Sequence, residues 1–195
     1  QGYAKDEIQL LAPTVELDFD GNGDFDDVDG VASSATIEST LTTWAVDAGD
    51  LLVYIVGHGG DGRFQITLGG EFLGVEELDS WLDQFQTATG KNVALIYDAC
   101  RSGSFIGNLF APPGVDRVII ASAAAGEPAW FIDQGRVSFS YQFCSAVFGK
   151  ADIVEAYRQA KAVMRRYQGA LIDADGNGQP DETEDYQIAA TVTLG

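Results

Sequence analysis

The chain has 195 residues, which is enough for one well-buried domain and too few for two of ordinary size. Its 30 acidic residues outnumber 11 basic ones, and the resulting net charge of -19 repels the phosphate groups of nucleic acids and of anionic lipids. The longest apolar stretch, residues 51–56, is far shorter than the roughly 20 residues that span a bilayer. These features exclude a membrane-spanning helix and argue against a nucleic-acid partner.

Short apolar runs separated by amphipathic segments predict alternating strands and helices. The pattern predicts strands at residues 8–12, 51–56, 63–68, 71–73, 91–97, 115–121 and 186–194. It predicts helices from residue 33 or 34 to about 48, and at residues 75–87, 138–148 and 152–167. The runs 51–56, 91–97 and 115–121 are apolar throughout, which is typical of strands covered on both faces. This order indicates one α/β domain with a mostly parallel sheet.

Two acidic, glycine-bearing segments, residues 18–29 and 173–184, share the spacing of a twelve-residue calcium loop. Oxygen-bearing side chains alternate along each segment, and glycine stands at position six, where a chain that wraps one ion turns sharply. The predicted Ca²⁺ ligands are Asp18, Asp20, Asn22, Asp24 and Asp29 in the first loop, and Asp173, Asp175, Asn177, Gln179 and Glu184 in the second. Asx-rich surface turns are the other interpretation. Two matches in one chain favour constitutive calcium binding, in the manner of dockerin or EF-hand-like loops embedded in a domain.

The only histidine, His58, and the first of two cysteines, Cys100, each follow a predicted buried strand. Ligands of open α/β sheets bind just beyond the carboxyl ends of the strands, and the residues between the two suffice for a right-handed crossover. A thiol needs a nearby imidazole to raise its thiolate fraction, and the imidazole also supplies a proton to a leaving amine. The Gly59 N–H and the Cys100 N–H are candidate oxyanion donors. The pattern therefore favours nucleophilic catalysis over an inert cysteine.

The sequences around these residues, YIVGHGG at 54–60 and YDACRSGS at 97–104, resemble the paired strand-end motifs of the caspase-haemoglobinase fold. They are most similar to legumain-like cysteine peptidases, especially the bacterial members, and next to metacaspases. The resemblance spans about residues 50–156. It implies a caspase-like α/β/α sandwich in which Cys100 is the nucleophile and His58 the general base and acid of an endopeptidase that forms an acyl-enzyme intermediate.

Asp98 stands two residues before Cys100, where legumains carry glutamate and metacaspases carry aspartate. Residues i and i+2 of an extended segment share a face, so Asp98 is expected to project into the cleft. The resemblance to metacaspases implies that this aspartate binds a basic P1 residue, which favours Arg or Lys over Asn. Ser122 and Asp133 are further candidates for lining the substrate pocket.

Cys144 is expected to be a small buried residue of the helix 138–148. The alternative is a disulfide with Cys100, which would abolish the nucleophile.

The whole chain, residues 1–195, is expected to be one peptidase domain that acts on peptide or protein substrates. Domains of this kind usually begin with a strand and helix ahead of residues 8–12. Their absence here predicts a fragment, with further domains of a larger precursor as partners.

Filled calcium loops point to an extracellular or periplasmic, secreted bacterial protein. A non-catalytic calcium-stabilised module, either a pseudo-enzyme or an assembly domain, is the competing function. A transpeptidase that uses the same dyad is a third.

Overall fold

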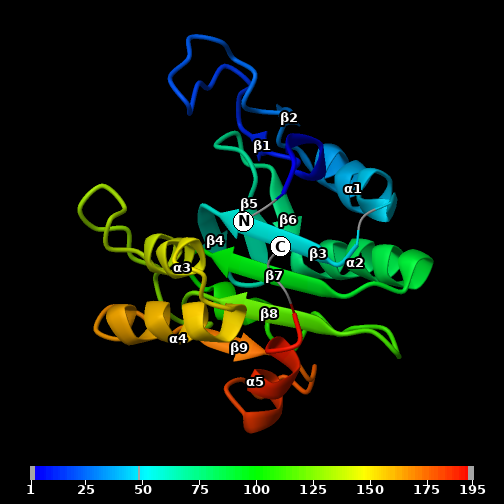
Figure 1. Cartoon of the computed structure of the whole chain (residues 1–195), viewed down its shortest axis with the longest axis vertical. Helices are drawn as coiled ribbons and strands as arrows, with labels where there is room; N and C mark the ends of the chain where they lie inside the picture. Colours follow the sequence, from blue (N-terminus) through cyan, green and yellow to red (C-terminus); the bar gives the residue numbers. More distant parts are fainter. Residues whose placement is uncertain (1–2, 48, 193–195) are drawn as a thin grey trace.

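The computed structural model describes residues 3–47 and 49–192, and its centre is a four-stranded sheet (Figure 1). The strand order is β3 (Leu51–Val56), β7 (Val93–Asp98), β8 (Arg117–Ala121) and β9 (Leu171–Asp173). β3, β7 and β8 run parallel, whereas β9 runs antiparallel to β8. The prediction of a mixed α/β domain with a mostly parallel central sheet is confirmed.

Helices cover both faces of this sheet (Figure 1). One layer contains α3 (Phe139–Phe148), α4 (Ile153–Met164) and α5 (Thr183–Ala189), and the other contains α1 (Ser34–Thr42) and α2 (Val75–Thr89). Alternate residues of β7 serve the two layers, because Ala94 and Ile96 pack with α3 and α4 while Leu95 and Tyr97 pack with α2. None of the described helices is both long and apolar enough to cross a membrane.

β3 is an edge strand whose two faces differ in exposure. The inward-facing residues of β3 are half-buried in the α1 and α2 layer, but Leu52, Tyr54 and Val56 are exposed. The prediction that residues 51–56 are covered on both faces is therefore wrong. The reason is that the core under α3 and α4 draws on β7, β8 and β9 and includes no buried residue of β3.

The last predicted strand, residues 186–194, is also wrong where the structure describes it, because α5 occupies Thr183–Ala189. The carboxylate of Asp185 accepts a hydrogen bond from the Glu182 N–H at 2.9 Å, which satisfies a free donor at the start of the helix. Tyr186 and Ala189, three residues apart, then face the core under α4. The apolar run belongs to one helix face rather than to a strand, and residues 193–194 of the predicted run lie outside the described residues.

Three smaller features complete the fold. The 3-10 helix η1 (Lys5–Glu7) comes first in the chain. Two short parallel strands, β1 (Leu11–Ala12) and β2 (Gly30–Val31), then flank the first acidic segment. An antiparallel sheet contains β4 (His58–Gly60), β5 (Arg63–Gln65) and β6 (Phe72–Gly74). The helix predicted to run to about residue 48 is divided, because α1 ends at Thr42 and the 3-10 helix η2 (Trp44–Asp47) follows. A further 3-10 helix, η3 (Ser102–Phe105), follows β7.

Side-chain caps define the starts of α3 and α4. The Ser138 side chain accepts a hydrogen bond from the Tyr141 N–H at 3.1 Å, and the Asp152 carboxylate accepts one from the Glu155 N–H at 2.8 Å. Each bond satisfies an N–H that has no partner within the helix itself. The cap of α3 matters for function, because this helix begins beside the carboxyl end of β7.

Candidate active site

The parallel pairing of β3 with β7 brings the two predicted catalytic residues to one edge of the sheet. Val56 lies opposite Asp98, and the Gly57 N–H donates to the Asp98 carbonyl oxygen at 3.2 Å. His58 and Cys100 each stand two residues further along the chain. The structure therefore contains the crossover that the sequence predicts, with both residues just beyond the carboxyl ends of neighbouring strands.

Gly59 lies directly against the backbone of Cys100. A β-carbon built on Gly59 would stand 2.2 Å from the Cys100 carbonyl oxygen and 2.7 Å from the Tyr97 hydroxyl, both closer than real contacts. Only glycine lets β4 approach the turn of Cys100 this closely. The side chain of His58 is exposed and that of Cys100 is partly exposed, so a peptide can reach both from solvent.

The turn after Cys100 is anchored to the segment that follows β8. Arg101 adopts a left-handed conformation with φ of 60°, and its N–H donates to the Glu127 carbonyl oxygen at 2.8 Å. The Cys100 Sγ lies 3.9 Å from the Ala129 carbonyl oxygen. The thiol thus lies between these two segments, and neither Cys100 nor Cys144 forms a disulfide.

Cys144 differs from both of its predictions. Its side chain is exposed on α3 rather than buried, and it is a free thiol rather than a partner of Cys100. Its place in the sequence explains the error, since Cys144 directly follows Phe143, which faces the core, and one helical step rotates a side chain by about 100° to another face. The protein therefore exposes a second thiol, which serves as an internal reference for reactivity.

Asp98, the last residue of β7, is only 1% exposed. Its Oδ2 accepts hydrogen bonds from the Ser140 N–H, at 2.9 Å, and from the Ser140 hydroxyl, which in turn accepts one from the Tyr54 hydroxyl. Loss of surrounding water raises the pKa of Tyr54, so this hydroxyl stays protonated and remains a donor. The other oxygen, Oδ1, is buried and has no hydrogen-bond partner among the described residues.

Ser122 occupies the corresponding position on the neighbouring strand. Tyr97 pairs with Ala121 across β7 and β8, and the Ser122 N–H donates to the Tyr97 carbonyl oxygen at 3.0 Å. Ser122 is fully buried, and its Oγ also lacks a partner within the described part of the chain. A buried polar atom costs free energy unless it is hydrogen-bonded. Asp98 and Ser122 are therefore neighbouring buried residues at the ends of β7 and β8, each with one polar atom that no described residue satisfies.

Asp133 lies apart from this pair. It is exposed in a turn closed by the bridge between Ile132 and Val137, and it has a positive φ of 52°. No hydrogen bond joins its side chain to Asp98 or Ser122 among the described residues. Of the three predicted substrate-binding residues, the structure groups Asp98 with Ser122 and leaves Asp133 at the surface.

Two residues of the hydrogen-bonded chain that ends at Asp98 were not among the predicted site residues. Ser140 is 42 residues from Asp98 in the sequence, and Tyr54 is 86 residues from Ser140. No local pattern signals a contact over such separations, because it depends on where α3 packs against the end of the sheet. The one signal for Ser140 is that it lies within the stretch, about residues 50–156, that resembles the legumain-like peptidases.

The first acidic segment folds into an open loop with converging carboxylates. Asp18, Asp20 and Asp27 each place one oxygen within 4.8 Å of the others. Hydrogen bonds from backbone N–H groups, chiefly that of Gly23, lower the pKa of Asp18. Asp27 belongs to this cluster and Asp29, which the loop spacing predicts, does not, because the Asp29 carboxylate instead accepts the N–H of Leu10 at 2.7 Å.

The second acidic segment has a more buried cluster. Asp173, Asp175 and Asp185 bring one oxygen each within 4.8 Å of one another, and Asp173 and Asp185 are 3% and 0% exposed. Burial, with added repulsion from the other two carboxylates, raises the pKa of Asp173. Glu184, the predicted twelfth ligand, points to solvent while the adjacent Asp185 turns inward. Within the described residues, no basic side chain pairs with any member of either cluster.

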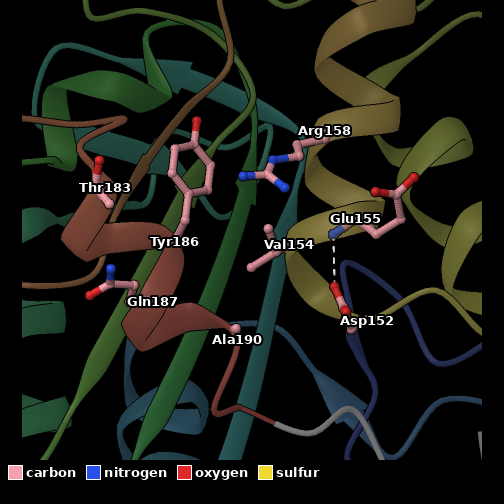
Figure 2. A pocket seen from close by; sticks show the side chains of 8 residues that line it. All are labelled: Asp152, Val154, Glu155, Arg158, Thr183, Tyr186, Gln187 and Ala190. Atoms are coloured by element: carbon pink, nitrogen blue, oxygen red, sulfur yellow. Dashed lines mark hydrogen bonds between the residues drawn. The ribbon is translucent and has the colours of Figure 1, made fainter.

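A shallow depression between α4 and α5 lies on another part of the molecule. The Arg158 guanidinium lies 4.6 Å from the centre of the Tyr186 ring, and Figure 2 shows both side chains and the cap bond of Asp152. None of the predicted catalytic or substrate-binding residues lines this depression. The chemistry-bearing side chains are therefore at the sheet edge instead.

Comparison with known proteins identifies one family. The model of the Peptidase C13 family matches residues 29–166, which include β3, β7, β8 and both strand-end motifs. The match covers more than two thirds of the chain and leaves the second acidic segment outside it. A search of curated proteins found no match.

Proposed function

The chain belongs to the Peptidase C13 family, the legumain family, and is a cysteine-type endopeptidase; we propose that it cleaves peptide bonds after Arg or Lys with a Cys100–His58 dyad. One observation carries the dyad. The pairing of Val56 with Asp98 sets His58 and Cys100 at equivalent positions beyond two adjacent strands, and Gly59 touches the Cys100 backbone.

In this mechanism the Cys100 thiolate attacks the carbonyl carbon of the scissile bond. The N–H groups of Gly59 and Cys100 stabilise the resulting oxyanion, and His58 donates a proton to the departing amine. Water then attacks the thioester with His58 as general base, which releases the acid product and restores the thiol. Cys100 and His58 are the only residues of the proposal that exchange protons with the substrate.

The P1 preference rests on the buried carboxylate of Asp98. One of its oxygens is saturated by Ser140, whereas Oδ1 and the nearby Ser122 Oγ lack partners in the described structure. A guanidinium or ammonium group would supply both the missing hydrogen bonds and the missing positive charge. A P1 Asn would supply N–H donors but would leave the buried charge uncompensated, so a basic residue fits better.

Fluorogenic peptides that differ only at P1 test this preference. We expect Arg and Lys substrates to be cleaved with higher kcat/KM than Asn or Asp substrates. Asp98→Asn should lower kcat/KM for the Arg substrate by at least about 30-fold, because a buried charge pair that loses one member costs about 2 kcal/mol or more. Asp133→Asn is the matched control and should change it by less than about threefold, since Asp133 is exposed. If the parent protein prefers the Asn substrate and Asp98→Asn keeps that preference, the role assigned to Asp98 is contradicted.

We also propose that the two acidic segments hold structural Ca²⁺ and that the protein works outside the cytoplasm, as a secreted or periplasmic bacterial peptidase. The donor set fits the ion, since Ca²⁺ takes six to eight hard oxygens and each segment offers three converging carboxylates. Asp18, Asp20 and Asp27 would hold one ion, and Asp173, Asp175 and Asp185 the other. Calcium-rich surroundings keep such loops filled, which supports the location.

A further inference from the structure

The hydroxyl of Ser104 bridges the two loops that carry the proposed dyad. Its Oγ accepts a hydrogen bond from the Gly62 N–H at 2.9 Å and donates to the Arg101 carbonyl oxygen at 2.7 Å. The Gly60 carbonyl oxygen is a second acceptor at 3.4 Å. Gly60 and Gly62 belong to the β4–β5 hairpin that begins with His58, and Arg101 follows Cys100.

The hydrogen bonds of the Ser104 hydroxyl lie beyond the point where the main sheet links the hairpin of His58 to the turn of Cys100. The pairing of β3 with β7 ends at Val56 and Asp98, and the last backbone bond between the two segments is from Gly57 to Asp98. In the described residues, every hydrogen bond between the hairpin 58–65 and the turn 100–104 passes through the Ser104 hydroxyl. Gly59 only touches the turn and sets how closely it can approach.

We propose that Ser104 is a positioning residue that fixes the His58 loop relative to the Cys100 turn; the proposal rests on the dyad proposed above. The hairpin has glycine at 59, 60 and 62. Its other side-chain ties, the packing of Phe64 against the core and the hydrogen bond from the Tyr97 hydroxyl to the Arg63 carbonyl oxygen at 3.3 Å, lie on β5 rather than on the His58 side. A displacement of the general base by about 1 Å can cost on the order of 100-fold in rate. One hydroxyl that satisfies donor and acceptor groups of both loops limits such displacement.

Ser104 acts on the chemical step rather than on substrate binding. The polar pair that receives the P1 side chain, Asp98 and Ser122, is held by β7, β8 and α3 and has no contact with the Ser104 hydroxyl. Loss of the bridge should therefore lower kcat and leave KM nearly unchanged. It should also slow alkylation of Cys100 at fixed pH, because the thiolate fraction depends on the nearby imidazole.

The test compares Ser104→Ala and Ser104→Thr in a Cys144→Ser background, which removes the other exposed thiol. We expect Ser104→Ala to lower kcat on an Arg substrate by about 10- to 100-fold with KM within about threefold. Alkylation by iodoacetamide should slow in parallel. Ser104→Thr keeps the hydroxyl and should restore at least about a third of kcat.

Ser33→Ala is the control for stability alone. Ser33 caps α1 by accepting the Thr36 N–H at 3.1 Å, so its loss should lower the melting temperature and leave kcat and alkylation unchanged. Folded Ser104→Ala with the kcat and alkylation rate of the parent overturns the proposal, as does a loss of kcat that Ser104→Thr fails to restore. If Ser104→Ala does not fold, the test rests on folded Ser104→Thr. A kcat of Ser104→Thr more than tenfold below that of the parent then overturns the proposal. A parent protein that neither cleaves peptides nor reacts at Cys100 refutes the dyad itself, which is a separate outcome.

Discussion

Gly59 is the residue at which the hairpin of His58 meets the turn of Cys100. Gly59→Ala places a methyl group 2.2 Å from the Cys100 carbonyl oxygen, so the hairpin or the turn must move. We expect kcat/KM to fall by about 100-fold or more, because both proposed oxyanion donors sit at this contact. Steady-state hydrolysis of the Arg substrate measures the effect.

Gly69→Ala, between β5 and β6, is the matched control for Gly59→Ala. A β-carbon at Gly69 meets only the Thr67 Oγ1, at 3.6 Å, which is an ordinary contact. This variant should keep kcat/KM within about twofold of the parent, since surface changes without lost contacts have small effects. Equal activity of Gly59→Ala and Gly69→Ala would show that close approach of the two loops is not required.

The sequence was sufficient to place His58, Gly59, Cys100 and Asp98 at or just beyond the ends of β3 and β7, and their catalytic and binding roles stay predictions. It was not sufficient for side chains that reach these residues from elsewhere, such as Ser140, whose contact with Asp98 requires α3 to pack at that end. Loop spacing placed the acidic segments but singled out Glu184, whereas the neighbouring Asp185 turns inward. A one-residue difference of this kind depends on where α5 begins.

At the scale of elements, Arg117 joins β8 to α2. Its guanidinium is 1% exposed and contacts Asp79 at 2.6 Å, Asp83 at 2.7 Å and Gln86 at 2.8 Å. Arg117→Met should destabilise the protein by about 2 to 3 kcal/mol, less than a fully buried pair because both carboxylates keep some contact with water. Urea unfolding at pH 7 measures this change. The control Arg166→Met makes the same substitution at an exposed arginine and should leave the free energy of unfolding nearly unchanged.

The destabilisation by Arg117→Met should depend on pH. Burial raises the pKa of Asp79, and the charge of Arg117 opposes that rise. Without Arg117 the folded state binds the Asp79 proton more readily than the unfolded state, so the stability of the variant falls as pH increases. The deficit relative to the parent should be smaller at pH 5 than at pH 7. A deficit that grows toward pH 5 contradicts this account of the α2–β8 contact.

The elements themselves show which sequence patterns are reliable. The strands β7 and β8 and the helix α2 were predicted, because burial on both faces leaves a short continuous apolar run and burial on one helix face leaves a 3.6-residue period. α5 was predicted as a strand because its apolar residues were considered without the acidic start that caps the helix. The exposed face of β3 was missed, since an apolar run does not reveal whether a helix reaches the edge of the sheet.

At the scale of the whole molecule, the charge of -19 is concentrated in part at the two acidic segments. Within the part of the chain that the structure describes, these six converging carboxylates have no basic partner and repel one another, and bound Ca²⁺ would remove this repulsion. Calcium at about 100 times its dissociation constant would add about 2.7 kcal/mol per site to stability. We therefore expect a chelator to lower the melting temperature by several degrees and excess Ca²⁺ to restore it.

The double variant Asp173→Asn, Asp185→Asn tests the more buried cluster directly. In this variant the difference in melting temperature between Ca²⁺ and chelator should lose most of what the second segment contributes. Glu76→Gln changes an exposed acidic residue on α2 and should keep the full difference. Differential scanning fluorimetry with and without chelator compares the three proteins. A melting temperature of the parent that is the same with chelator and with Ca²⁺ contradicts calcium binding.

The most direct test of the account is covalent labelling by an irreversible peptidyl electrophile with Arg at P1, followed by peptide mass spectrometry. The protein offers two free thiols, and the proposed mechanism predicts that Cys100 is modified while the exposed Cys144 is not. His58→Ala should greatly slow the labelling, and an excess of Arg substrate should protect Cys100. Modification of Cys144 alone, or of neither thiol, in the folded protein would contradict the assignment of Cys100 as the nucleophile.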